Sequence, residues 1–356
     1  MKSKFIYSLT CIGLILLIAI TGCNKASTST SAPATYQQVN LVADSAGYGT
    51  ARIDPYLNNA WGIAIGPTGA LWIASNHKGL STVYDRNGIQ LMTPVNIPLG
   101  LNANGSSPAG VVYNTTSSFI IPLTAQVSKF IFSTEDGIIS AWSSGTSAIT
   151  VVDKSASGKV YKGIAMATSG TSNYVYATDF HNGKVDAFDG AFYSVGMPFL
   201  DPTIPAGFAP FNIQNIAGQL YVTYAMQKSP DKHDDQSGVG NGYVSIFNYD
   251  GTFVRRFASQ GTLNSPWGIV QAPSGFGLGS NDILVANFGD GRINIFDANG
   301  NYQGQLMAGT SPLSIDGLWD ITFPQNSIPA GDPNQLFFTA GPQHENHGLF
   351  GYIKKN

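Results

Sequence analysis

The chain has little charge and almost no cysteine. Only 11% of its 356 residues are charged, the formal net charge is −3, and no basic stretch is longer than a pair of residues. We therefore expect no nucleic-acid partner. The two cysteines, Cys11 and Cys23, both lie near the N-terminus. This excludes a disulfide framework or a thiolate metal site from the rest of the chain.

The first 22 residues predict a lipoprotein signal peptide. Two lysines precede a mostly apolar run (residues 5–20), and a Thr-Gly pair stands directly before Cys23. The run is shorter than the roughly 20 residues that span a membrane comfortably, which disfavours the alternative of an uncleaved membrane helix. We expect cleavage after residue 22 and lipidation of the Cys23 thiol. The protein would then be anchored in a bacterial cell envelope, outside the cytoplasm.

Residues 23–35 (CNKASTSTSAPAT) predict a flexible tether, because they contain too few apolar side chains to form a core. Residues 36–356 are then expected to form one domain. Glycine is abundant throughout the chain, with 41 residues, and proline contributes 19. Together they interrupt every candidate for a long amphipathic helix, so an all-β domain is favoured.

A short sequence marker recurs six times after the tether. Each copy has three residues: the first is usually large, the second is usually glycine, and the third is Ile or Val. The middle residues of the six copies are 62, 110, 163, 212, 268 and 320. Steps of roughly fifty residues are typical of propeller blades. Each unit continues with a Val/Ile-rich strand, an alternating strand and tight turns. The repeat predicts a six-bladed β-propeller of four-stranded antiparallel blades.

The two ends of the domain complete each other in this interpretation. The last unit stops one strand short at Asn356, and residues 36–44 (YQQVNLVAD) form a spare strand ahead of the first marker. We expect this strand to complete the last blade and close the ring, which removes open sheet edges. Pairs such as Asn87-Gly88 predict two-residue turns before the outermost strands.

The repeat resembles NHL-type and related six-bladed propellers in its order of Trp-Gly-Ile, a turn, Leu-x-Val-x-Asn and Gly-x-Ile-x-x-Phe-Asp-x-x-Gly. The phrases FSTEDGIISAW, HDDQSGVGNGYVSIF and IDGLWDITF are more closely similar to an uncharacterised bacterial propeller family, whose members are secreted or surface-sorted. The likeness covers nearly all of the chain after the signal. It implies the fold and implies no activity.

All five histidines fall in one class of predicted loop, which joins the second and third strands of a blade. They are His77, His181, His233, His344 and His347. In a propeller these loops lie on the face onto which the central channel opens. Histidine is common on exposed turns in general, but the loops of the opposite face have none. We therefore expect this face to carry the function.

Two of these loops predict a metal site. The fourth blade's loop contains a long insertion with DKHDD, and the sixth contains HENH. The candidate ligands are His233, Asp234, Asp235, His344, Glu345 and His347. Imidazole with carboxylate suits zinc, whereas carboxylates with amide and carbonyl oxygens suit calcium. Neither loop matches a known metal motif, and a solvated loop is the alternative. A shared site requires the insertion to fold inward across the channel.

A second candidate set lies where the second strands end, at the channel mouth. It comprises Asn76, His77, Asp179, His181, Asn287 and Asp290. Its amide and acid side chains resemble the calcium ligands of lactonase-like propellers, although Thr134, Ala225 and Ala340 stand at the corresponding places of the other blades. The alternative role of Asn and Asp here is to cap turns.

The tryptophans of three markers, Trp61, Trp267 and Trp319, predict either an aromatic platform for a ligand or large rings that pack between blades, and we favour packing.

The sequence contains no G-x-S-x-G motif and no phosphate-binding loop. We therefore favour a binding module over an enzyme, with no catalytic residue identified. The ligand would be an unknown protein, peptide or carbohydrate, and the protein is expected to be monomeric. A metal-dependent hydrolase acting on lactones or esters is the alternative, with metal-bound water as nucleophile.

Overall fold

The structure is a computed structural model that describes Met1, Lys4 and residues 34–100, 105–279, 281–324, 329 and 331–356. The chain divides into two compact units, Met1–Pro33 and Ala34–Asn356. The predicted signal peptide, Cys23 and most of the tether lie outside the described residues. Among the residues that are described, no helix has the length and apolar character needed to cross a membrane.

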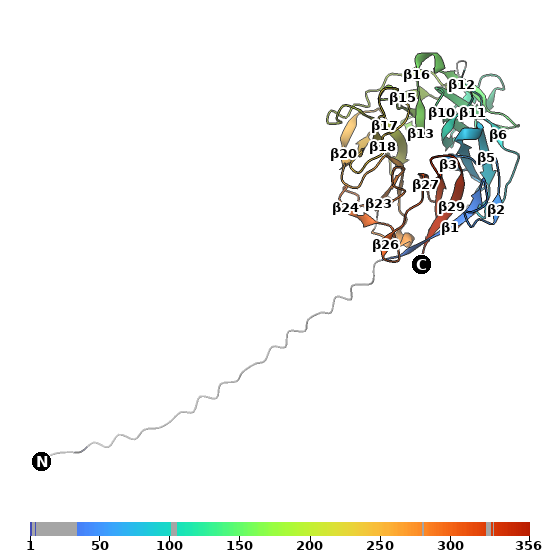
Figure 1. The fold of residues 1–356 in the computed structure, drawn as a ribbon. Helices are drawn as coiled ribbons and strands as arrows, with labels where there is room; N and C mark the ends of the chain where they lie inside the picture. The colour runs from blue at the N-terminus through green and yellow to red at the C-terminus, as the bar shows by residue number, and fades with distance from the viewer. Residues whose placement is uncertain (2–3, 5–33, 101–104, 280, 325–328, 330) are drawn as a thin grey trace. The chain divides into compact units, whose positions relative to one another are not determined.

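The second unit is an all-β, six-bladed propeller of antiparallel blades, as the repeat predicts (Figure 1). Blade 1 contains β3 (Ala60–Ile65), β4 (Leu71–Ser75), β5 (Leu80–Tyr84) and β6 (Val95–Asn96). Blade 2 contains β7 (Pro108–Tyr113), β10 (Phe130–Thr134), β11 (Ile138–Trp142) and β12 (Ile149–Asp153). Blade 3 contains β13 (Tyr161–Ser169), β14 (Ser172–Asp179), β15 (Lys184–Asp189) and β16 (Ser194–Val195).

The remaining blades follow the same order from the axis outward. Blade 4 contains β17 (Phe208–Ile216), β18 (Gln219–Met226), β19 (Gly242–Phe247) and β20 (Phe253–Ser259). Blade 5 contains β21 (Pro266–Gln271), β22 (Ile283–Asn287), β23 (Ile293–Phe296) and β24 (Tyr302–Gln305). Short elements connect them: β8 (Ile120–Ile121), β9 (Gln126–Val127), β25 (Met307–Ala308), β26 (Ser311–Pro312), η1 (Asn76–Lys78), η2 (Ser155–Ser157) and η3 (Ser274–Phe276).

Blade 6 closes the ring with both ends of the domain (Figure 1). It contains β27 (Leu318–Thr322), β28 (Leu336–Ala340), β29 (Leu349–Lys355) and β1 (Tyr36–Ala43), with β2 (Arg52–Ile53) parallel to β1. Tyr36 pairs with Lys355 and Ala43 with Leu349. The predicted closing strand is therefore confirmed. No blade is left with its outer strand missing, which protects the sheet edge.

The turns before the outermost strands differ from the prediction. In blade 1 the N–H of Asp85 bonds to the carbonyl of Ile89 at 2.8 Å, so three residues make the turn instead of two. Gly88 takes a positive φ of 75°, whereas Asn87 does not. The Asp85 carboxylate accepts the N–H groups of Asn87 and Ile89, both at 2.8 Å, and so stabilises the longer turn.

Aromatic rings fill the centre of the propeller. Trp61 stacks on Trp319 with ring centroids 3.7 Å apart, Phe288 stacks on the other side at 3.9 Å, and Trp267 meets both tryptophans edge-on. All three tryptophans are at most 2% exposed. They therefore pack against one another on the axis and do not form an open aromatic platform. We call these rings and the neighbouring Phe180 and Phe211 the aromatic floor.

Glycines let the innermost strands approach one another around this floor. A Cβ on Gly62 would lie 2.7 Å from the carbonyl oxygen of Ala109 in blade 2, and one on Gly268 would lie 2.8 Å from that of Trp319 in blade 6. Carbon atoms do not approach backbone oxygens so closely. The glycine of the marker is thus required by packing between blades.

Replacing Gly268 by alanine should lower the free energy of unfolding by about 1–3 kcal/mol, because the new methyl group forces blades 5 and 6 apart. Gly196→Ala is the matched control, since a Cβ there meets no atom within 4 Å. It should change stability by no more than about 0.5 kcal/mol. Urea denaturation of both variants measures the difference, and equal midpoints would contradict the packing role of Gly268.

Candidate functional site

A buried ion pair lies above the aromatic floor, at the end of the channel that faces the histidine-bearing loops. Lys162, near the start of β13, is 2% exposed and forms a salt bridge with Glu135, which follows β10. The Lys162 ammonium also lies 4.9 Å from the ring centre of Trp61 and 5.8 Å from that of Phe180. A desolvated cation gains from such ring faces. Lys162 is therefore held by blades 1, 2 and 3.

Amide groups hold the carboxylates of this region in place. Asn76 donates a hydrogen bond to Glu135 Oε2 at 2.7 Å. Asn59 donates to Glu345 Oε2 at 2.7 Å, and its own Oδ1 accepts from the indole of Trp319 at 3.1 Å. The site is thus connected to the aromatic floor through Asn59.

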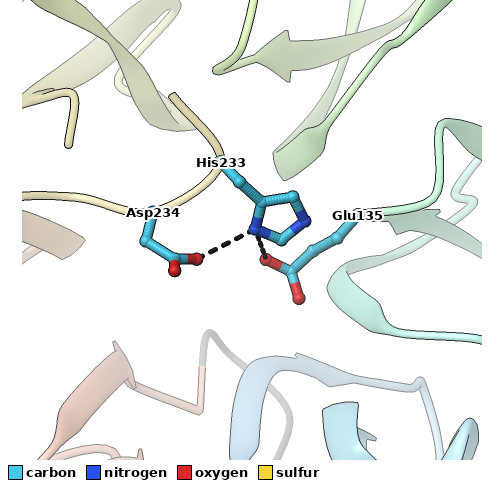
Figure 2. Close-up of side chains that lie close together, drawn as sticks. All are labelled: Glu135, His233 and Asp234. Atoms are coloured by element: carbon cyan, nitrogen blue, oxygen red, sulfur yellow. Dashed lines mark hydrogen bonds and ion pairs between the residues drawn. The ribbon is translucent and has the colours of Figure 1, made fainter. Parts of the chain in front are cut away.

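The insertion of blade 4 folds inward over blade 3. Gln227 donates to the carbonyl of Phe180 at 2.6 Å, and His181 Nδ1 lies 2.9 Å from the carbonyl oxygen of Asp231. Beyond this contact, His233 Nδ1 lies 2.9 Å from Asp234 Oδ1 and 4.0 Å from Glu135 Oε1 (Figure 2). The insertion therefore reaches from blade 4 to blade 2.

The backbone around Glu345 is strained. Gln343, His344 and Glu345 all have positive φ values, of 56°, 56° and 65°. Three successive left-handed residues without glycine cost of the order of 1–2 kcal/mol each. Such strain persists where surrounding contacts determine it, often at functional sites. Here the turn directs the Glu345 side chain toward Asn59.

We define the mouth cluster as six ionisable side chains: Glu135, Lys162, His233, Asp234, Asp235 and Glu345. Lys162 is within electrostatic reach of Glu135, Asp234 and Glu345, and Glu345 is within reach of Asp235. The inward fold of the insertion, on which a shared site depends, is therefore present. Glu135 and Lys162 were not among the residues predicted from the sequence. Lys162 is the first residue of one marker, and the first residues of the other five markers are uncharged. This difference is the one sequence signal that could have indicated a role for Lys162.

The cluster contains charged and neutral groups side by side. Burial would raise the pKa of Glu135, but Lys162 and His233 hold it below its usual value, and Glu135 in turn raises the pKa of Lys162 against the effect of burial. A hydrogen bond to His233 lowers the pKa of Asp234 to about 2, and the same bond raises the pKa of His233. These four groups are ionised or readily become so.

The other two acids hold their protons more tightly. Burial raises the pKa of Glu345 to about 7, with Asn59 acting against it and Glu135 adding to it. Burial also raises the pKa of Asp235, against the hydrogen bond from Ser265. Both carboxyl groups would become more acidic if a further positive charge entered the mouth cluster.

The structure separates other predicted residues from the cluster. His344 is exposed, and His347 turns outward, with Nδ1 3.1 Å from Asp44 Oδ1 and 3.1 Å from Ser45 Oγ. Both contacts use the same ring nitrogen, so this trio lacks the geometry of a catalytic triad.

The second predicted set is also divided. Asn76 contacts Glu135, and His77 Nε2 lies 3.3 Å from Asn59 Nδ2, so both adjoin the mouth cluster. The others have separate partners: Asp179 binds Lys159 and Asn182, His181 meets Asp231, and Asn287 donates to Thr262 and Asp290. A calcium site shared by the whole set is not formed by these contacts.

Three side chains of the mouth cluster fit a metal ion. One ligand atom each from Glu135, His233 and Asp234 lie within 4.8 Å of one another. Two carboxylates and one imidazole suit zinc or another transition metal. The Lys162 ammonium already binds Glu135, so an ion here would share that carboxylate with the lysine.

Two uncharacterised proteins of Acanthamoeba polyphaga mimivirus are 35% and 34% identical to this chain. The alignments cover 90% of this chain in both cases, and 80% and 86% of the viral proteins. The chain belongs to their family. No protein-family model matches it. These family members are viral, so they give no support to the bacterial origin that the sequence resemblance implied.

Solved structures show the family's fold in other proteins. A streptogramin B lyase matches with a TM-score of 0.53 and 11% identity, covering 90% of this chain and 97% of the lyase. An α-L-arabinofuranosidase of Fusarium graminearum matches with a TM-score of 0.55 and 12% identity, covering 89% of this chain and 97% of that enzyme. At such low identity the likeness shows a shared propeller fold alone.

Replacing Glu345 by glutamine should flatten the pH dependence of stability. Because its pKa is raised from 4.5 to about 7 on folding, Glu345 favours the folded state below pH 4.5, and this contribution is lost as the pH rises toward 7. The loss is at most about 1.4 kcal/mol per pH unit. The variant should therefore gain stability relative to wild type between pH 5 and pH 8.

Urea denaturation at pH 5, 6, 7 and 8 measures this difference. Asp320, whose pKa burial also raises to about 7, contributes to both proteins alike. Asp231→Asn removes an exposed carboxyl group from the insertion and serves as the control. Parallel curves for Glu345→Gln and wild type would refute the raised pKa.

Proposed function

We propose that this protein is a binding module that takes a positively charged ligand at the mouth cluster. One observation carries this proposal: four carboxyl groups from blades 2, 4 and 6 converge on Lys162. They outnumber the nearby basic groups, and burial raises the pKa of two of them, Glu345 and Asp235. Because the pKa of Glu345 is about 7, a cationic ligand beside it would displace its proton, so binding should release protons near neutral pH.

The loops that form the mouth cluster also support a binding role. The insertion is a long surface loop on a rigid scaffold, a common position for recognition sites. The exposed side chains of His233 and Asp234, 45% and 61% accessible, are available to a ligand, whereas the Lys162–Glu135 pair lies beneath them.

A metal-dependent hydrolase acting on lactones or esters is the second candidate. The proximity of Glu135, His233 and Asp234 favours it. A divalent metal held there would lower the pKa of a bound water, and Glu345 lies near enough to Glu135 to feel its charge. The carboxyl group of Glu345 could exchange a proton near pH 7. This candidate requires a bound metal, whereas the binding module does not.

Zinc, manganese or calcium should raise the melting temperature of the domain (residues 36–356). At a concentration one hundred times the Kd, binding stabilises the folded state by about 2.7 kcal/mol. His233→Ala and Asp234→Asn should abolish the increase, since both side chains are candidate ligands and are exposed enough to replace without unfolding. His344→Ala, exposed on the same face, is the control and should retain it.

Calorimetric titration in buffers of different ionisation enthalpy counts the protons released on binding. Proton release that disappears in Glu345→Gln supports cation binding at the mouth cluster. If the domain neither contains metal nor responds to any of the three ions, the hydrolase candidate fails. Binding of an organic cation such as spermidine would then be the remaining test of the binding module.

We further propose that lipidated Cys23 anchors the protein outside the cytoplasm, on the strength of the signal-like order of residues 1–23. Cys23→Ser should move the protein from the membrane fraction to the soluble fraction and leave the fold unchanged. Fractionation followed by circular dichroism measures both effects. Retention of the variant in the membrane fraction would refute lipid anchoring.

A further inference from the structure

The end of the propeller axis opposite the mouth cluster contains a hollow. The ends of the innermost strands of blades 1, 2, 3, 4 and 6 line a space of about 500 Å³, with Ile65, Tyr113, Met166, Gln214 and Phe323 among the lining residues. A second space of about 560 Å³ extends toward blade 5 and shares Gln214, Asn215 and Phe323 with the first. Volumes of this size are usual for small-molecule sites. We call the two spaces together the lower hollow.

The lower hollow is separate from the mouth cluster. β3 begins beside Asn59, which belongs to the mouth, and ends at Ile65 in the hollow. A strand of this length spans about 20 Å. The aromatic floor, which is buried, lies between the two ends. A ligand of the lower hollow would therefore touch none of the mouth cluster.

The lining of the lower hollow is uncharged. None of the described residues that line either space is Asp, Glu, Lys, Arg or His. Amide and hydroxyl groups, such as those of Gln214, Asn215, Thr115 and Thr322, alternate with apolar side chains. This contrasts with the opposite end, where the six ionisable side chains of the mouth cluster lie together. A charged ligand would lose its hydration here without gaining a counter-ion.

The polar side chains that line the hollow differ in whether they already form hydrogen bonds within the protein. Asn215 is fixed, because it donates to the carbonyl of Met166 at 3.0 Å and accepts from Tyr249 at 2.9 Å. Gln214, which lies in both spaces, is half-buried, and its side-chain amide has no hydrogen-bond partner among the described residues. Its amide can donate and accept at once. It is thus the group most available to a ligand.

We propose that the lower hollow binds a neutral saccharide. Sugar hydroxyl groups donate and accept as the amide of Gln214 and the lining hydroxyls do, and the C–H faces of a sugar ring suit the apolar side chains of Met166 and Ile65. A purely apolar ligand would leave Gln214 and the threonines unpaired. This proposal is independent of the function proposed for the mouth cluster.

Isothermal titration calorimetry of the domain against neutral tetrasaccharides of glucose, xylose, mannose and N-acetylglucosamine tests the proposal. At least one should bind with a Kd below 1 mM. Gln214→Ala should weaken binding at least fivefold, since it removes the amide. Gln214→Glu should do so too, because it keeps the shape but adds a charge. Gln303→Ala, on the exposed outer strand β24, is the matched control and should bind as wild type.

Circular dichroism and melting verify that the variants fold. Binding that is lost in both Gln214 variants and kept in the Gln303 control supports the proposal. It is overturned if no saccharide binds at millimolar concentration, or if binding persists in both Gln214 variants. It is also overturned if an uncharged, end-capped tetrapeptide binds and the saccharides do not. Metal binding at the mouth does not affect any of these readouts, so the two proposals fail independently.

Discussion

Crowding at the axis determines much of this structure. Six innermost strands meet around a few aromatic rings, and neighbouring blades approach until a single methyl group at Gly62 or Gly268 would contact the next backbone. Aromatic contacts of this kind are worth about 0.5–1.5 kcal/mol each beyond the burial of their surface. Because the rings fill the axis, the propeller has two separate ends instead of an open channel.

The filled axis explains why Lys162 can be buried. An ammonium group without water needs a counter-ion and favours aromatic faces. Glu135 supplies the first, and Trp61 and Phe180 supply the second. The pair is expensive to desolvate, so it is weak support for a purely stabilising role. The additional carboxyl groups of Asp235 and Glu345 go beyond what one lysine requires. Their convergence is the observation on which the proposed cation-binding role rests.

The sequence predicted the fold well because the fold is repetitive. Local sequence patterns reveal the markers, their spacing of roughly fifty residues and the spare strand before Trp61. These patterns can be recognised because they recur six times. The inward direction of the insertion and the outward direction of His347 could not be predicted. They depend on single contacts between segments far apart in the sequence, such as Gln227 with Phe180 and His347 with Asp44. The left-handed turn that orients Glu345 contains no glycine and gives no sequence signal.

The pairing of Glu135 with Lys162 could not be predicted from the sequence either. They are 27 positions apart and belong to different blades, so no motif joins them. The repeat does allow the six blades to be aligned with one another. At the first position of the marker, Lys162 then stands where the other blades have Trp, Ala or Phe. A charged residue at a position that faces the axis must find partners there, because the alternative is an unpaired buried charge. Other departures from the marker have structural partners, since Asn212 donates to the carbonyl of Trp267 and Asp320 accepts the N–H of Ile63. Lys162 differs from them because its partner is a carboxylate of the mouth cluster.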